Sequence, residues 1–340
     1  MEILQTFLFS DFLGTPAYFW LIFISVVVGL LVLDLGVLHK GQKEIEARES
    51  FLLYGGYMAI AFAFGAWVWH ARGAQSGLEF FTGYLIEQSL AMDNIFVIAT
   101  VFAFLGIPRL YQHRVLFWGI LGVIVLRAMM IGLGATLVSE FSWVLYIFAA
   151  FLIFTGVKMF FAGDHDPDVS KNPVVRWIST HMRVTPKLHD QHFFVKVPDD
   201  KTGKLVTAVT PLFVALVVIN LADLVFAVDS VPAIFAITTD TFIVYTSNIM
   251  AILGLRALYF ALSAMIHRFY YLKYALASVL VFIGSKIFVS DFLLGGAKFP
   301  PVLSLGVTFG LIAAGVAYSL WKTRHGEDAA PHMPHDSIRP

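Results

Sequence analysis

The sequence predicts an all-α membrane protein, a polytopic helical bundle of about nine transmembrane helices that contains an inverted repeat of 3+3 spans. Three observations predict this class: the composition, the number of long apolar runs, and an internal repetition of charged motifs. Of the 340 residues, 59% are hydrophobic and only 14% are charged, whereas soluble domains carry about 25% charged residues. The formal net charge is zero, so no basic surface indicates a nucleic acid partner. The expected surroundings are a lipid bilayer.

Nine apolar runs approach the roughly 20 residues that a helix needs to cross a bilayer. They lie near 17–38, 51–70, 79–105, 115–138, 144–161, 207–235, 244–265, 272–290 and 302–321. Most Lys and Arg residues fall in the first, third, fifth and seventh connections and in the C-terminal tail. The positive-inside rule then places the N-terminus outside and the C-terminus in the cytoplasm. The first run has no basic segment before it and no cleavage site after it, which predicts a retained span.

The runs group into units along the chain. The predicted order is an N-terminal two-span unit, a three-span repeat, a cytoplasmic linker with short helices around 173–183, a second, inverted three-span repeat, a ninth span and a disordered cytoplasmic tail. Their bounds are 1–78, 79–161, 162–206, 207–290, 291–321 and 322–340. Gly83 and Pro232 weaken the third and sixth spans, so we expect these two spans to be kinked or broken.

The internal repeat is clearest in two matching F-x-G-x-K-x-F segments, 154–160 and 282–288. The span before each of them carries a matching Leu-Arg-Ala segment, around Arg127 and Arg256. With the acidic segments described next, three consecutive spans repeat in the order acid, Arg, Lys. Because three is an odd number, the second copy must cross the membrane in the opposite direction. Inverted repeats of this kind are typical of secondary transporters that bind their substrate near the midplane.

Two acidic segments lie inside apolar runs, and each has two carboxylates six residues apart with a small polar neighbour. Their polar residues are Glu87, Asp93 and Asn94 in the first segment, and Asp223, Asp229 and Ser230 in the second. Ionisable residues in membrane spans are costly and by default functional. Six residues correspond to about 600° on a helix, so the two acids of a segment lie about 120° apart. A local unwinding, or a crevice wrapped by both segments, is needed to bring all four together.

These side chains, with freed backbone carbonyls, make an oxygen-only ligand set that suits Mn²⁺, Ca²⁺ or Mg²⁺. The sequence has no cysteine, which excludes thiolate metal sites, disulfides and thiol redox chemistry. The alternative reading is charge pairing within the membrane. The charge-balancing or gating candidates are Arg127, Arg256, Lys158, Lys286 and Asp34. The two Arg lie deeper and are the better partners for acids, whereas each Lys lies late in its span and can reach the interface.

The segments 83–97, 223–235 and 246–260 resemble the TerC family, and the similarity runs from about 15 to 320. The resemblance is closest to the Alx-like manganese exporter branch, which belongs to the LysE-type transporter superfamily. It implies a multi-pass transporter of the bacterial inner membrane whose metal-binding acids correspond to Glu87, Asp93, Asp223 and Asp229. One position departs from the family, because Asn220 stands where members usually have Glu. An amide can still bind a cation, so Asn220 is included among the expected metal ligands.

The expected function is Mn²⁺ export, with the cation as transported ligand, protons as a candidate coupling ion and no organic cofactor. Ca²⁺ transport is an alternative, and so is a membrane factor that delivers Mn²⁺ to exported enzymes. No enzymatic activity is expected. An intramembrane aspartyl protease would need two Asp that share a proton, but neither Asp93 nor Asp229 lies in the Gly-x-Gly-Asp motif. A homo-oligomer remains open.

Overall fold

The fold was analysed in a computed structural model, which describes residues 2–36, 47–161, 173–185, 188–198, 205–263, 271–295 and 299–324. Within these residues, nine helices are long and apolar enough to cross a membrane. The predicted all-α class and the nine spans are therefore confirmed. Residues 325–340, most of the predicted disordered tail, lie outside the described residues.

The spans begin and end at residues that favour such boundaries. Gly73, with φ of 93°, separates the second and third spans, and Gly106, with φ of 59°, turns the chain before Pro108 starts the fourth. Asp240 caps the seventh by accepting from the backbone N–H groups of Phe242 and Ile243. The spans are α2 (Ala17–Gly36), α3 (Ala47–Arg72), α4 (Ala74–Phe104), α5 (Arg109–Glu140), α6 (Val144–Phe161), α8 (Pro211–Phe235), α9 (Thr241–Leu253) with α10 (Leu255–Leu262), α11 (Leu272–Phe288) with the π-helical turn η3 (Val289–Leu293), and α12 (Pro301–Arg324).

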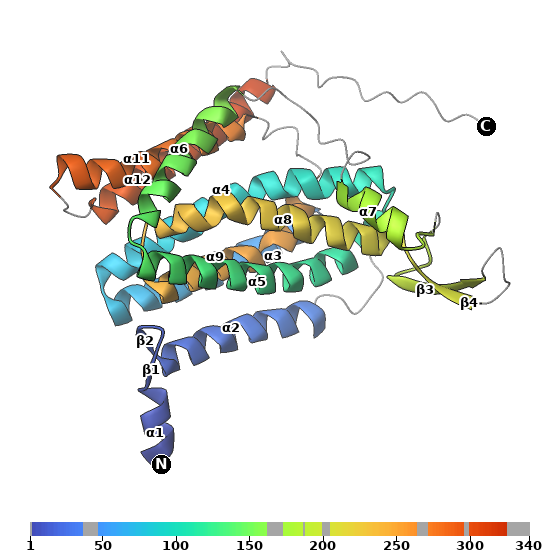
Figure 1. Cartoon of the computed structure of the whole chain (residues 1–340), viewed down its shortest axis with the longest axis horizontal. Coiled ribbons are helices and arrows are strands. Elements are labelled where there is room, and N and C mark those ends of the chain that lie inside the picture. The colour runs from blue at the N-terminus through green and yellow to red at the C-terminus, as the bar shows by residue number, and fades with distance from the viewer. Residues whose placement is uncertain are drawn as a thin grey trace.

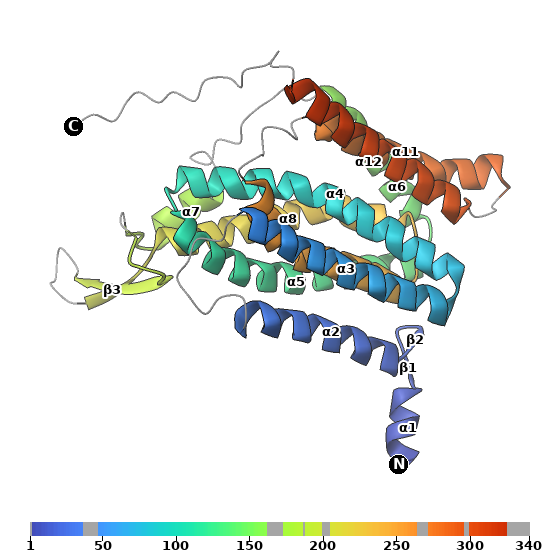
Figure 2. The same ribbon diagram turned by 180° about the vertical axis from the view of Figure 1, so that it is seen from behind.

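The spans form a central group with a layer on either side (Figures 1 and 2). α3, α4, α5, α8 and α9 run alongside one another, and α2 covers one side of this group. On the opposite side α6, α11 and α12 form a second, oblique layer. α4 and α8, which carry the two acidic segments, pack against each other in the centre. Glu87 of α4 and Asp223 of α8 are thus buried within the bundle.

The expected breaks in the third and sixth spans are wrong. α4 and α8 are each one continuous helix. Pro232 lies in the last turn of α8, so the backbone hydrogen bond that it cannot donate is lost only near the end of the helix. Gly83 instead permits close packing, since a Cβ there would lie 2.3 Å from the Ile234 side chain. The interrupted span is the seventh, which changes from α9 to α10 at Gly254.

α6 and α11 cross at the two glycines of the repeated segment. A Cβ on Gly156 would lie 2.7 Å from the carbonyl oxygen of Ala277, and a Cβ on Gly284 would lie 2.6 Å from that of Ala149. The contact is reciprocal. Gly156 and Gly284 occupy matching positions in the two repeats, and so do the residues that they contact, Ala149 and Ala277. This is the packing expected where equivalent helices of an inverted repeat meet. The division of the chain into units by residue number stays a prediction.

The connection between the halves contains α7 (Pro173–His181), which confirms the short helix expected near 173–183. It also contains an unpredicted antiparallel hairpin of β3 (Phe194–Pro198) and β4 (Leu205–Val209). At the N-terminus, α1 (Glu2–Leu8) and a small hairpin of β1 (Asp11–Phe12) and β2 (Thr15–Pro16) precede the first span, and these too were not predicted. The two hairpins lie at opposite ends of the bundle (Figure 1).

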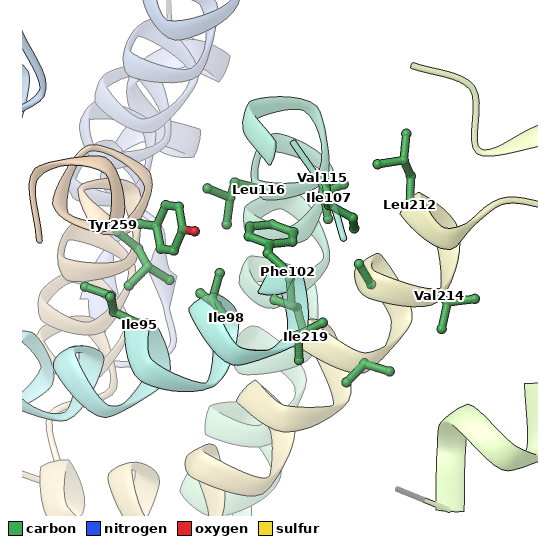
Figure 3. Close-up of a cluster of buried hydrophobic side chains, with 14 of the residues drawn as sticks. Ile95, Ile98, Phe102, Ile107, Val115, Leu116, Leu212, Val214, Ile219 and Tyr259 are labelled. Carbon is green, nitrogen blue, oxygen red and sulfur yellow. The ribbon is translucent and has the colours of Figure 1, made fainter. Parts of the chain in front are cut away.

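The largest apolar cluster lies where α4 ends and α5 and α8 begin (Figure 3). Phe102 from α4 packs against Tyr259 from α10, with ring centroids 5.7 Å apart at a near-perpendicular angle. Ile95 and Ile219 belong to the same cluster and are fully buried. Because these two residues directly follow Asn94 and precede Asn220, the cluster adjoins the polar centre described below.

Candidate functional site

The polar centre of the bundle is built around Arg127, which is 1% exposed near the middle of α5. Its guanidinium forms ion pairs with both Glu87 of α4 and Asp223 of α8. Nε and Nη2 bind the two oxygens of Asp223, each at 2.9 Å, which is the two-pronged geometry that makes Arg–carboxylate pairs strong. Nη1 donates to Glu87. One acid from each predicted repeat therefore binds the same cation.

Neutral side chains complete this centre. Nη1 of Arg127 also donates to the Ser230 hydroxyl at 2.9 Å and to the Asn248 carbonyl oxygen at 3.4 Å. The Asn248 amide donates to Glu87 at 2.7 Å, and the Asn94 amide donates to Asp223 at 2.9 Å. We call Glu87, Asn94, Arg127, Asp223, Ser230 and Asn248 the central cluster.

Four helices supply the central cluster: α4, α5, α8 and α9. Asp223 and Ser230 lie two turns apart on α8 and so share one face of that helix. Asn248 was not among the expected ligands. The signal for it is the run Thr246-Ser-Asn248, three polar residues within an otherwise apolar span. All three are fully buried.

Two carboxylates and one guanidinium leave the central cluster with one uncompensated negative charge. Removing charges from water is costly, and the cost is recovered only when each ion is paired and hydrogen-bonded. The guanidinium is thus the cation that the two acids bind in this structure. Among the described residues, no three His, Asp or Glu side chains gather closely enough to hold a metal without help from other groups.

Asp229 does not join the central cluster. It accepts a hydrogen bond from Thr155 of α6 at 3.3 Å and lines a cavity of about 260 Å³ between the central helices and the oblique layer. Lys158 and Arg127 line the same cavity. The side chain of Asp93 lies outside the described residues. The expected convergence of all four acids on one ion is therefore not what the described residues form, since Glu87 and Asp223 meet and Asp229 lies beside them.

Asn220 lies one turn before Asp223 and faces α5. Its amide donates to the carbonyl oxygen of Leu216 at 2.8 Å. Its Oδ1 lies against Gly122, where a Cβ would be only 2.1 Å away. That oxygen has no hydrogen-bond partner, and neither has Oδ1 of Asn94.

The remaining charge-balancing candidates lie elsewhere. Arg256 of α10 forms a buried ion pair with Asp34 of α2, and the hydroxyl of Tyr57 donates to the same carboxylate at 3.0 Å. Lys286 is 8% exposed between α11 and α12 and approaches the Ser304 hydroxyl at 3.4 Å. The two Arg of the repeat thus have different partners, one from within the repeat and one from the N-terminal unit.

A second cavity, of about 350 Å³, opens where α4 ends and α5 begins. Arg109, Gln112 and Tyr259 line it, and the Tyr259 hydroxyl donates to Gln112 at 3.0 Å. Phe102 also lines this cavity and belongs to the apolar cluster of Figure 3. We call this cavity the vestibule. The apolar cluster lies between it and the central cluster.

Comparison with known proteins identifies the relatives of this chain. The model of the integral membrane protein TerC family matches residues 72–327. An "Uncharacterized membrane protein" of Rickettsia bellii is 47% identical over 301 residues, which cover 88% of this chain and 96% of the relative. A protein of Escherichia coli strain K12 with the name "Putative membrane-bound redox modulator Alx" is 43% identical over 317 residues, covering 91% and 95%. No solved structure matches the chain.

Proposed function

The chain belongs to the TerC family of integral membrane proteins, and we propose that it transports a divalent cation, with Mn²⁺ as the exported substrate. One observation carries the proposal: acids from the two predicted repeats converge on a single buried cation near the middle of their spans. Transporters with inverted repeats bind their substrate at such a place. The neutral groups that accept from this cation are both oxygens, from Ser230 and Asn248, and Mn²⁺ and other hard cations prefer oxygen ligands.

The proposed transport step is an exchange between Arg127 and the metal ion. A divalent cation would neutralise Glu87 and Asp223 completely, whereas the guanidinium neutralises only one of them. The two cations cannot occupy the site together, because their charges repel at short distance in a medium of low dielectric constant. When the metal leaves, Arg127 returns, so the two acids are never buried without a partner.

Asp229 gains a role in this exchange. The cavity of about 260 Å³ is lined by both Arg127 and Asp229, so the displaced guanidinium has space and a carboxylate beside its present position. We therefore assign Asp229 to Arg127 rather than to the transported ion. We therefore expect Asp229→Asn to lower the affinity for Mn²⁺ and to leave the stability of the metal-free protein nearly unchanged.

The proposed location is the bacterial inner membrane, with the N-terminus outside and the C-terminus in the cytoplasm. The distribution of Lys and Arg among the connections supports this orientation. The vestibule then faces the cytoplasm, because it lies where α4 ends and α5 begins. Export would begin there.

Mn²⁺ flux into liposomes that contain only the purified protein tests the proposal. Glu87→Gln and Asp223→Asn should each abolish flux, because a desolvated divalent cation needs its charged ligands. Glu140→Gln, at the exposed end of α5, and Asp11→Asn, in the N-terminal hairpin, are the matched controls and should transport normally. Normal flux in either cluster variant would refute the proposal. Mn²⁺ binding without flux in the unmodified protein would favour a delivery factor instead.

A further inference from the structure

The seventh span consists of two helices, α9 and α10, that meet at Gly254. Neither space nor backbone conformation requires a glycine at this junction. Its φ of −79° and ψ of −11° lie in the right-handed helical region, and a Cβ would lie 3.5 Å from the Tyr54 ring, at ordinary van der Waals distance. Glycine weakens a helix relative to alanine. What Gly254 adds at the break between the two helices is therefore conformational freedom.

The two helices on either side of Gly254 serve different regions of the protein. α9 supplies Asn248 to the central cluster, whereas α10 supplies Leu255, Leu258 and Tyr259 to the apolar cluster of Figure 3. Residues of α4, α5 and α8 form the rest of that cluster, which separates the vestibule from the central cluster. An apolar constriction of this kind excludes water and ions until it widens. A cation from the vestibule must therefore wait for this barrier to open.

α10 is held more extensively on one side than on the other. It packs mainly against α3, and its Arg256 forms the buried ion pair with Asp34 of α2. It packs less extensively against α4 and α5. On that side the Tyr259 hydroxyl donates to Gln112 at 3.0 Å, and the Tyr259 ring lies edge-on to Phe102. α10 can thus separate from α4 and α5 while its contacts with α2 and α3 persist.

We propose that α10 is the cytoplasmic gate of the transport path and that Gly254 is its hinge. The Asp34–Arg256 ion pair anchors the gate to α2, and the Tyr259–Gln112 hydrogen bond latches it to α5. Opening separates α10 from α4 and α5, so the vestibule becomes continuous with the central cluster. Because α9 lies on the other side of the hinge, the central cluster keeps its ligand from the seventh span. The role of the gate in export rests on the proposed transport function.

A cysteine placed in the barrier reports opening without any transport. Leu258 is 2% exposed within the apolar cluster. In this cysteine-free chain, a water-soluble methanethiosulfonate should therefore modify Leu258→Cys only while the gate is open. The reaction rate in the purified full-length protein measures how often the gate opens.

Two substitutions should change this rate in opposite directions. Gly254→Ala should slow it about fivefold, the factor that corresponds to the difference in helix propensity between glycine and alanine. Tyr259→Phe keeps the ring but loses the latching hydrogen bond, so it should speed the reaction about fivefold. Gly55→Ala, which has open space for its Cβ, is the control and should leave the rate unchanged. A general loss of stability would not produce opposite effects.

Mn²⁺ flux into liposomes links the gate to transport. Gly254→Ala should lower the maximal rate about fivefold, while Mn²⁺ affinity at equilibrium stays the same because the central cluster keeps all its ligands. A pair of cysteines, Gln112→Cys with Tyr259→Cys, should stop flux when joined by a short bifunctional methanethiosulfonate, and dithiothreitol should restore it. The control pair is Lys196→Cys with Thr207→Cys, which face each other across β3 and β4 and should transport normally when joined.

The gate and the transport function fail in different ways. Absence of Mn²⁺ flux in the unmodified protein would refute the transport function, whereas the opposite shifts in Leu258→Cys labelling would still support the hinged movement of α10. Normal flux in the joined Gln112→Cys, Tyr259→Cys pair would overturn the gate. Equal labelling rates in Gly254→Ala, Tyr259→Phe and the parent would overturn it as well, since α10 would then be a fixed part of the span.

Discussion

Replacement of Arg127 by Gln removes the cation that holds the two central acids. Arg127 donates to Glu87, Asp223, Ser230 and Asn248, and it is 1% exposed. Removing one partner of a buried ion pair typically costs about 3–5 kcal/mol, because the remaining charge is left buried. The free energy of unfolding of Arg127→Gln should fall by about this amount. Arg72→Gln is the control, because Arg72 pairs with Asp240 while 20% of its side chain is exposed, so its loss should cost less than the loss of the fully buried Arg127.

Mn²⁺ should restore much of this lost stability. With the guanidinium absent, the metal no longer has to displace a competing cation, so its affinity for Glu87 and Asp223 should rise. A ligand present at 100 times its Kd stabilises the folded state by about 2.7 kcal/mol. Saturating Mn²⁺ should therefore raise Tm more in Arg127→Gln than in the unmodified protein.

Denaturant or thermal unfolding in detergent micelles, with and without Mn²⁺, measures both effects on the same samples. Arg127→Gln combined with Glu87→Gln and Asp223→Asn should be more stable than Arg127→Gln alone, because the stranded charges are gone. If Arg127→Gln unfolds like Arg72→Gln, or if Mn²⁺ stabilises it no more than the unmodified protein, the guanidinium is not the resident partner of these acids.

Three further predictions follow from the packing and the topology. Gly156→Ala should lower Tm, because its Cβ would press on backbone atoms of α11, whereas Gly55→Ala, which has open space around it, should raise Tm slightly. Asp34→Asn and Arg256→Gln should reduce stability by similar amounts, and the double variant should be more stable than the sum of the two effects implies; strict additivity would mean that this pair is not coupled. A single cysteine introduced at Lys196 in β3 of this cysteine-free chain should react only with maleimides that enter the cell; labelling of intact cells by an impermeant maleimide would reverse the orientation.

The span count, the all-α class and the two acids that meet at Arg127 could be predicted from sequence because they depend on local signals. Hydropathy identifies each span, and an acid within a span is identified as functional because its burial in the membrane is energetically costly. Which acid each Arg pairs with could not be predicted in this way. Arg127 and Arg256 occupy matching positions in the repeated motifs, yet Arg256 pairs with Asp34, because α2 lies outside the repeat and packs near only one of them.

The positions of the acids relative to one another and the place of the helix break also depend on packing, so the sequence alone did not predict them. Glu87 and Asp223 reach a shared cation, whereas Asp229 faces α6, and this difference depends on how the oblique layer packs against α8. The break was expected at Pro232 but lies at Gly254. Pro232 lies in the last turn of α8 and leaves the helix before it continuous, whereas a glycine in the middle of a span costs about 1 kcal/mol relative to alanine. Asn248 has no charge, so the polar run 246–248 is a weaker signal than an acid, and the hydrogen bond to Glu87 is what assigns Asn248 to the central cluster.

The exchange of Arg127 for a divalent cation is tested most directly by locating Mn²⁺ through its anomalous X-ray scattering in crystals of the protein grown with the ion. The account predicts a peak between the carboxylates of Glu87 and Asp223, with the Arg127 guanidinium turned away into the cavity that Asp229 lines. A Mn²⁺ peak elsewhere in the bundle, with Arg127 still bound to both acids, would contradict it.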